Sequence, residues 1–128
     1  MNVRRSAPAV ALATAVACFV SPASATREIV VPSRVQVVAT EFQLALSRRT
    51  IKSGRAVVEL VNYGEDDHDL RMLRLARGAK MLKIRTVLPG DDAQLRATLA
   101  PGKFVLWCSI ADHRKLGMEA RLTVTKRT

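Results

Sequence analysis

Apolar and polar residues alternate with a period of two along much of the chain. The alternation is clearest in four segments, residues 42–46, 58–60, 95–99 and 120–124. A period of two puts every second side chain on the same face, so these segments are expected to be strands with one buried face. No stretch repeats its apolar residues at the helical period. The pattern therefore predicts strands and short connections.

Short turn sequences separate the alternating segments. They are Lys52-Ser53-Gly54, Asn62-Tyr63-Gly64, Pro89-Gly90-Asp91-Asp92 and Pro101-Gly102. Gly, Pro, Asn and Asp favour the backbone conformations of tight turns. About seven or eight short strands joined in this way predict an all-β fold, a Greek-key antiparallel β-sandwich. Residues 76–83 do not alternate, and we expect either a short helix or a loop there, at the edge of the sandwich.

The first 25 residues have the pattern of an export signal. Arg4 and Arg5 precede an apolar run over residues 7–20, and Ala23-Ser24-Ala25 has the small residues of a cleavage site. We therefore expect a signal peptide over residues 1–25 and one folded domain over residues 26–128, located in the periplasm or another extracytoplasmic space. In a second interpretation Cys18 carries a lipid, which would anchor the protein to the outer face of a membrane.

The length and the charge restrict the function. The chain has 128 residues, enough for one ordinary domain but too few for a multidomain enzyme. Its formal net charge of +10 makes nucleic acid the first partner to consider. The basic residues are scattered, however, and lack the interleaved aromatic residues of a base-stacking surface. We expect no nucleic-acid partner and attribute the charge to attraction toward acidic proteins or anionic membrane surfaces.

Few residues of the predicted domain can carry chemistry. Cys108 is its one cysteine, so an intramolecular disulfide cannot form, and His68 and His113 are the two histidines of the whole chain. Taken singly, each has an ordinary explanation: a buried thiol, or a histidine on a hydrated loop. A free thiol in an oxidising compartment nevertheless requires protection, either by burial or by a metal.

The spacing of these residues changes their interpretation. Cys108, His113 and Met118 follow the pattern C-x4-H-x4-M between two predicted strands, and His68 opens another strand. All four side chains can therefore meet at one end of the sandwich. One thiolate, two imidazoles and a weak thioether form the ligand set of a blue-copper site.

The chain resembles the cupredoxins, the small type 1 copper proteins such as plastocyanin, azurin, auracyanin and rusticyanin. The resemblance is carried by Asn62-Tyr63-Gly64 through His68-Asp69-Leu70 and by Pro101-Gly102-Lys103-Phe104 running into the loop of residues 108–118. It implies that His68, Cys108, His113 and Met118 bind one copper ion, with a loop spacing similar to that of rusticyanin and auracyanin. Asp69 stands where many members carry Asn or Ser. It is expected either to hydrogen-bond Ser109 or to lower the reduction potential.

The ligand set favours one-electron transfer over catalysis. One copper ion uses every candidate ligand, which leaves no histidine for a second, substrate-binding copper. A Cys108–His113 nucleophilic pair would leave His68 and Met118 unexplained. We therefore expect a non-enzymatic electron carrier. The alternatives are a carrier or buffer that delivers copper to another envelope protein, and a domain that binds zinc or no metal.

The same loop suggests how redox partners would dock. By the resemblance, the ring of His113 should approach the surface inside an apolar patch with a basic rim of Arg114 and Lys115. The patch would consist of Ile110, Ala111, Leu116 and Gly117. Trp107 should point to the face opposite Cys108, where it could serve as a second entry point for electrons. We expect a monomer whose redox partners have acidic docking surfaces.

Overall fold

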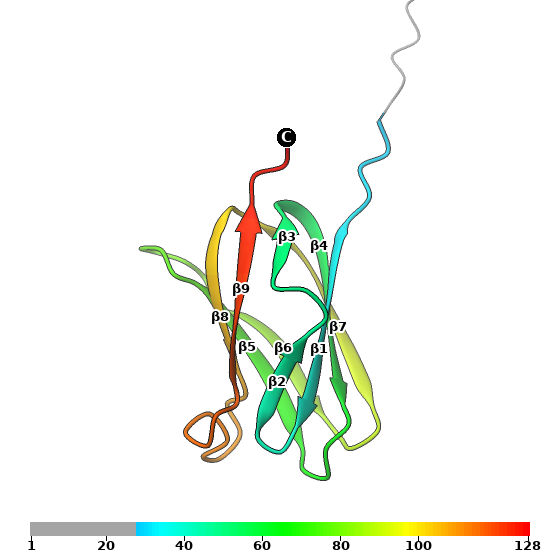
Figure 1. Cartoon of the computed structure of the whole chain (residues 1–128), viewed down its shortest axis with the longest axis vertical. Coiled ribbons are helices and arrows are strands. Elements are labelled where there is room, and N and C mark those ends of the chain that lie inside the picture. Colours follow the sequence, from blue (N-terminus) through cyan, green and yellow to red (C-terminus); the bar gives the residue numbers. More distant parts are fainter. Residues whose placement is uncertain (1–27) are drawn as a thin grey trace, which may run out of the picture.

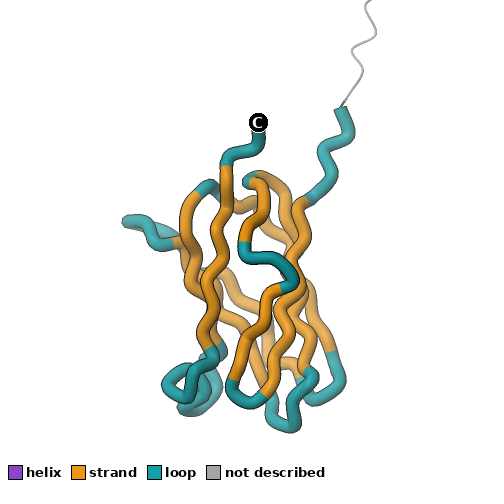
Figure 2. The backbone as a smooth tube through the Cα atoms, in the orientation of Figure 1, coloured by secondary structure: helices purple, strands orange, loops and turns teal. Residues whose placement is uncertain are grey.

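The computed structural model describes residues 28–128. This part of the chain contains nine strands. Figure 2 shows its backbone as strands joined by loops and turns. None of the residues it describes forms a helix long and apolar enough to cross a membrane. The predicted signal peptide over residues 1–25, with Cys18, lies outside the described residues, as does the start of the predicted domain at residues 26–27.

The nine strands form two sheets that pack face to face (Figure 1). One sheet has the order β2-β1-β4-β7 and the other the order β3-β9-β8-β5-β6. The predicted all-β sandwich is thus confirmed. The strands are β1 (Ser33–Thr40), β2 (Gln43–Leu46), β3 (Thr50–Lys52), β4 (Gly54–Asn62), β5 (His68–Arg74), β6 (Leu82–Val87), β7 (Asp92–Leu99), β8 (Gly102–Trp107) and β9 (Glu119–Thr125).

Two of the strand pairings are parallel, although the sequence predicted an antiparallel sandwich. β1 pairs in parallel with β4, and β3 pairs in parallel with β9. Between β2 and β3 the chain leaves the first sheet and joins the second. After this crossing it turns at Ser53 and returns in β4, which therefore runs in the same direction as β1.

The alternating pattern predicts the buried faces correctly. Leu44 is buried between exposed Gln43 and Ala45, and Leu122 and Val124 are buried while Thr123 between them is exposed. These side chains belong to one core between the sheets, which also contains Cys108 and Met118. The copper ligands predicted from the sequence thus lie at the end of a continuous apolar interior.

The segment that does not alternate forms a loop. Residues 75–81 connect β5 to β6, and β6 already begins at Leu82. Of the two expectations for residues 76–83, the loop is confirmed over residues 76–81 and the short helix is wrong. Gly78 adopts a φ of +69°, in the left-handed region, which interrupts a helical backbone.

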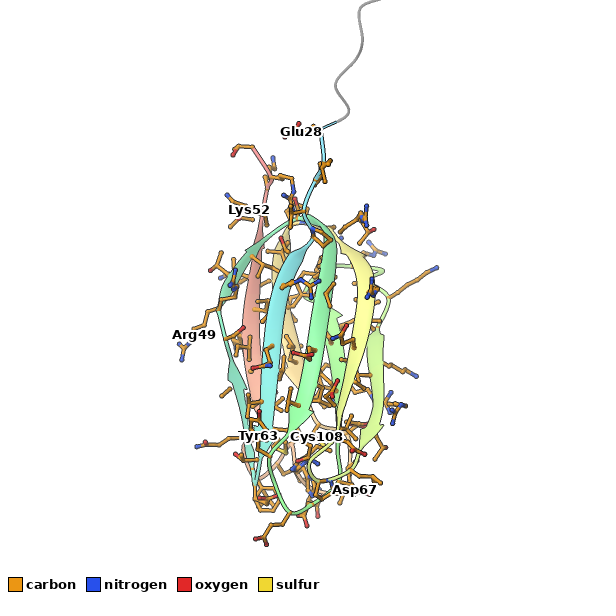
Figure 3. All side chains as sticks on the ribbon, turned by 90° about the vertical axis from the view of Figure 1, so that its right-hand side faces the viewer. Glu28, Arg49, Lys52, Tyr63, Asp67 and Cys108 are labelled. Atoms are coloured by element: carbon orange, nitrogen blue, oxygen red, sulfur yellow. The ribbon has the colours of Figure 1, made fainter. Side chains whose placement is uncertain are left out.

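Four connections gather at one end of the sandwich. They join β1 to β2, β4 to β5, β6 to β7 and β8 to β9, and they lie at the lower end in Figure 1. Figure 3 shows Cys108, Tyr63 and Asp67 at this end and Lys52 and Glu28 at the other. The fold therefore brings the segments that carry His68 and residues 108–118 together, away from the end where the chain enters β1.

Candidate metal centre

His68, Cys108 and His113 converge at this end of the core. Each offers one potential ligand atom, and the three atoms all lie within 4.8 Å of one another. The Sγ atom of Cys108 is 3.9 Å from Nδ1 of His68 and 3.6 Å from Nδ1 of His113. His68 and Cys108 are fully buried, and His113 is 8% exposed. The structure therefore brings together three of the four predicted ligands with one nitrogen of each imidazole facing the thiol.

Strand pairing brings His68 near Cys108. His68 is the first residue of β5, and Cys108 directly follows β8. These strands are antiparallel neighbours, with Arg71 opposite Trp107. The start of β5 and the end of β8 therefore meet at the same end of the sheet, although the two residues are 40 positions apart in the chain.

Backbone hydrogen bonds within the 108–118 loop hold its two ends, Cys108 and Met118, together. The amide of His113 donates to Ile110 at 3.1 Å, and the amide of Met118 donates to the carbonyl of His113 at 3.1 Å. The amide of Cys108 donates to the carbonyl of Met118 at 3.2 Å. Met118, the fourth predicted ligand, is fully buried and shares the core cluster of Cys108. Its backbone is thus tied to both other ligand-bearing residues of the loop.

Asp69 joins the two halves of the site. Its carboxylate accepts hydrogen bonds from the amide and the hydroxyl of Ser109, both at 2.6 Å. The expected contact between Asp69 and Ser109 is thereby confirmed. Arg71 also pairs with this carboxylate at 3.0 Å, so the buried negative charge has a cationic partner. The amide of Asp69 points toward Sγ of Cys108 at 3.5 Å, which favours a thiolate.

Burial dominates the electrostatics of the thiol. Desolvation raises the pKa of Cys108, while backbone amide hydrogen bonds from Asp69 and Ile110 act in the opposite direction. A thiol in such a place needs a nearby cation to remain deprotonated. Two imidazole nitrogens and a buried sulfur form a donor set that fits a borderline or soft metal ion. The residues present therefore fit a copper ion.

Three contact residues were missed by sequence reasoning. Oε1 of Glu41 lies 3.3 Å from Nε2 of His68, Oδ2 of Asp66 lies 3.7 Å from Nε2 of His113, and the ring of Phe42 is centred 5.0 Å from that of His113. Glu41 and Phe42 belong to the β1–β2 connection, distant in sequence from every ligand. No local spacing in the chain indicates these contacts.

The surface around His113 agrees only in part with the predicted patch and rim. Leu116 is 59% exposed, Ala111 and Gly117 are exposed, and Ile110 is half-buried. Both cations of the expected rim form ion pairs: Arg114 with Glu119 at 2.9 Å and Lys115 with Asp112 at 2.7 Å. The residues of the predicted patch therefore lie at or near the surface, and both cations of the rim have acidic partners, with Glu119 shared between Arg114 and Arg121.

Trp107 lies outside the core cluster that contains Cys108. Its ring is half-buried and is covered by the guanidinium of Arg114, 4.3 Å from the ring centroid. The side chain thus occupies the face opposite Cys108, as the alternation predicted.

The described structure is similar to those of known copper proteins. Auracyanin from Roseiflexus castenholzii, in its dithionite-reduced form, matches with a TM-score of 0.60 and 17% identity, over 73% of this chain and 97% of that one. Auracyanin A, a "blue" copper protein from Chloroflexus aurantiacus, matches with a TM-score of 0.60 and 11% identity, over 73% and 99%. The chain has a cupredoxin fold. Together with the donor set, these cupredoxin neighbours support one type 1 copper ion.

Cupredoxin folds also occur inside larger proteins. A multicopper oxidase matches with a TM-score of 0.56 and 14% identity, over 73% of this chain but only 44% of that one. No protein-family model and no curated protein sequence matches the chain. The relationship to the cupredoxins is thus one of structure, while the predicted function rests on the chemistry of the site.

Proposed function

We propose that this protein binds one copper ion through His68, Cys108, His113 and Met118 and acts as an exported one-electron carrier. The observation that carries the proposal is the convergence of two imidazoles and the thiol, with their ligand atoms within 4.8 Å, inside the core. Met118, fully buried in the same core cluster as Cys108, would supply the thioether of the ligand set. When bound, the ion supplies a Cu(I)/Cu(II) couple.

The protein's own residues hold the ligands in place and keep water out. Full burial of His68 and Cys108 excludes solvent from the thiol. The hydrogen bonds between Asp69 and Ser109 fix β5 relative to the segment after β8. Ligand residues held in this way would keep similar positions in both oxidation states, which favours rapid electron exchange. His113, slightly exposed beside the apolar patch, is the proposed route for electrons between the site and a partner.

Electron transfer is preferred over enzymatic catalysis for two reasons. The chain has two histidines, and both belong to the proposed site. A second copper site for substrate, as a copper oxidase or reductase would need, therefore has no histidine ligand in this chain. The raised pKa of Cys108 also disfavours a thiolate nucleophile in the metal-free protein.

Burial also favours a resident ion over copper delivery. A copper carrier must release its metal to a partner, which is easiest from exposed and exchangeable ligands. Two of the proposed ligands, His68 and Cys108, have no exposed surface, and Met118 has none either. This arrangement supports an ion that stays in place while electrons pass.

The redox partner is proposed to dock at the patch formed by Ile110, Ala111, Leu116 and Gly117. Because Arg114 and Lys115 are paired with acids, the patch itself contributes little positive charge. The attraction of a partner with an acidic docking surface would come from the net charge of the whole protein, which is +10 for the full sequence, of which Arg4 and Arg5 of the predicted signal peptide contribute two. We also propose that the protein is exported and monomeric, and that it can associate with a membrane, either peripherally or through a lipid anchor.

Visible spectroscopy during a Cu(II) titration tests the proposed function. We expect an intense thiolate-to-copper band at one equivalent that is bleached by ascorbate and absent in Cys108→Ala. Met81→Leu, which changes an exposed methionine far from the site, serves as the control and should keep the band. A colourless protein that retains zinc, or weak and exchangeable copper, would contradict electron transfer and favour the zinc or delivery alternatives.

A further inference from the structure

A carboxylate lies behind the ring of His68. Glu41, in the connection between β1 and β2, places Oε1 3.3 Å from Nε2 of His68. The other ring nitrogen, Nδ1, faces Sγ of Cys108 at 3.9 Å. The two nitrogens of this buried ring therefore have different neighbours: a carboxylate oxygen on one side and the thiol on the other.

This arrangement selects one tautomer of neutral His68. An ionised carboxylate can only accept a hydrogen bond, so its neighbour Nε2 must carry the ring hydrogen. Nδ1 is then left with a free lone pair that points toward Cys108. This is the tautomer that a metal ligand binding through Nδ1 requires, and its orientation is set by the bond made at the other nitrogen.

Glu41 is itself held in place by the β4–β5 connection. The same Oε1 atom accepts hydrogen bonds from the amides of Glu65, at 2.7 Å, and Asp66, at 2.9 Å. These amides, with that of Asp66 first, keep the pKa of Glu41 below its usual value. Gly64 provides the space, because a Cβ atom at this residue would overlap the Glu41 carboxylate, with Cδ only 2.9 Å away.

The same contact also influences the second histidine. By holding the amide of Asp66, Glu41 fixes the backbone of a residue whose Oδ2 lies 3.7 Å from Nε2 of His113. His113 in turn directs its Nδ1 toward Cys108 at 3.6 Å. Both imidazoles thus have a carboxylate near Nε2 and the thiol near Nδ1.

We propose that Glu41 is a positioning residue that fixes the tautomer and orientation of His68 and places a carboxylate beside its Nε2. The inference rests on the proposed copper site. A negative charge at this place stabilises the more highly charged Cu(II) state, so it lowers the reduction potential. Glu41 acts through the ring of His68, because its carboxylate faces Nε2 while Nδ1 faces the thiol.

Three variants separate the hydrogen bonds of Glu41 from its charge. Glu41→Gln retains an oxygen that can accept all three hydrogen bonds but removes the charge. Glu41→Ala removes both. Gly64→Ala keeps the charged carboxylate of Glu41 but moves it away from its present position. The added Cβ atom would overlap the carboxylate, which lies at the end of a flexible side chain. Glu65→Gln is the matched control, because it removes an equal charge from an exposed side chain of the same connection.

The measured quantities are the reduction potential, the affinity for Cu(II) and the His68 tautomer in the metal-free protein, read by 15N NMR. For Glu41→Gln we expect the ratio of Cu(II) to Cu(I) affinity to fall about tenfold, which raises the potential by about 59 mV. Glu41→Ala and Gly64→Ala should weaken Cu(II) binding about 10- to 100-fold. Glu65→Gln should change the potential far less, because water and salt screen its exposed charge.

The proposal is overturned if Glu41→Gln shifts the potential no more than Glu65→Gln, or if Glu41→Ala retains the wild-type Cu(II) affinity. A hydrogen on Nδ1 of His68 in the metal-free wild-type protein would also overturn it. The NMR measurement needs no metal, so comparing the His68 tautomer in the wild type and in Glu41→Ala tests the role of Glu41 even if copper does not bind. Failure of copper binding alone would instead contradict the proposed function.

Discussion

The carboxylate of Asp69 accepts two hydrogen bonds of 2.6 Å from Ser109, one from the amide and one from the hydroxyl. One partner directly follows His68 and the other directly follows Cys108. The bonds therefore join the two chain segments that must stay in register for the imidazole and the thiol to face each other. Arg71 completes the arrangement by pairing with the same carboxylate at 3.0 Å.

Replacing Asp69 should destabilise the protein before any metal is added. Asp69→Ala leaves the Ser109 amide and Arg71 without their partner, and we expect a loss of about 2 kcal/mol in the free energy of unfolding. Ser109→Ala keeps the amide bond to Asp69 but removes the hydroxyl bond to it and the bond that Arg71 donates to the hydroxyl at 3.0 Å, and it should cost about 1 kcal/mol. Urea denaturation of the metal-free variants measures both values. Equal losses in the two variants would contradict this account of Asp69.

Replacing Met118 should tune the site without abolishing its colour. Met118→Leu keeps an apolar side chain of similar volume in the core but removes the thioether. Loss of this weak donor disfavours Cu(II), so we expect the reduction potential to rise by about 60 mV, equivalent to a tenfold change in relative affinity. Voltammetry measures the shift, with Met81→Leu as the remote control. An unchanged potential would show that Met118 is only a core residue.

Electron self-exchange tests the apolar patch without a known partner. Two copies that exchange an electron must approach through the surface nearest the metal, so a charge at Leu116 should oppose their contact. We expect Leu116→Asp to slow self-exchange at least about tenfold, as measured by NMR line broadening in mixtures of oxidised and reduced protein. Leu75→Asp is matched in exposure, 53% against 59%, but lies in the β5–β6 connection. If both variants slowed exchange equally, another surface would be responsible.

Glu59 should make the free energy of unfolding depend on pH. Hydrogen bonds from Gln36 and Gln94, at 2.9 Å each, lower the pKa of this β4 carboxylate. Because the pKa is lower in the folded state, the stabilisation is present above the unfolded value, about 4.5, and is lost as the pH falls through the folded value. Glu59→Gln should therefore flatten the decline in stability below that pH. Denaturant midpoints at a series of pH values measure it, and parallel curves for wild type and variant would refute it.

The sequence predicted those parts of the site that depend on local spacing. Cys108, His113 and Met118 lie on one connection, and the strand pattern placed His68 at the start of a strand, so their convergence could be anticipated. Alternation also identified the buried faces of β2 and β9. These features depend on which residues are near one another in the chain or on one face of one strand.

Glu41 and the parallel pairing of β1 with β4 could not be predicted in this way. Glu41 meets His68 across 27 residues, through the relative placement of two connections. A period of two shows which face of a strand is buried, but it does not show which strand lies beside it. Likewise, Arg114 and Lys115 were expected to form a basic rim, and only the folded loop reveals that Glu119 and Asp112 neutralise them.

The pairing of β5 with β8 has a consequence for how the protein matures. His68 and Cys108 are separated by 40 positions and meet only after these strands have paired, so an unfolded chain offers an incoming ion the donors of residues 108–118 without His68. An ion that binds only the folded state stabilises it by about 4 kcal/mol at a thousandfold excess over its dissociation constant. The rate at which the colour appears during refolding would accordingly report the rate at which β5 and β8 pair. The metal would bind after folding and stabilise the folded state.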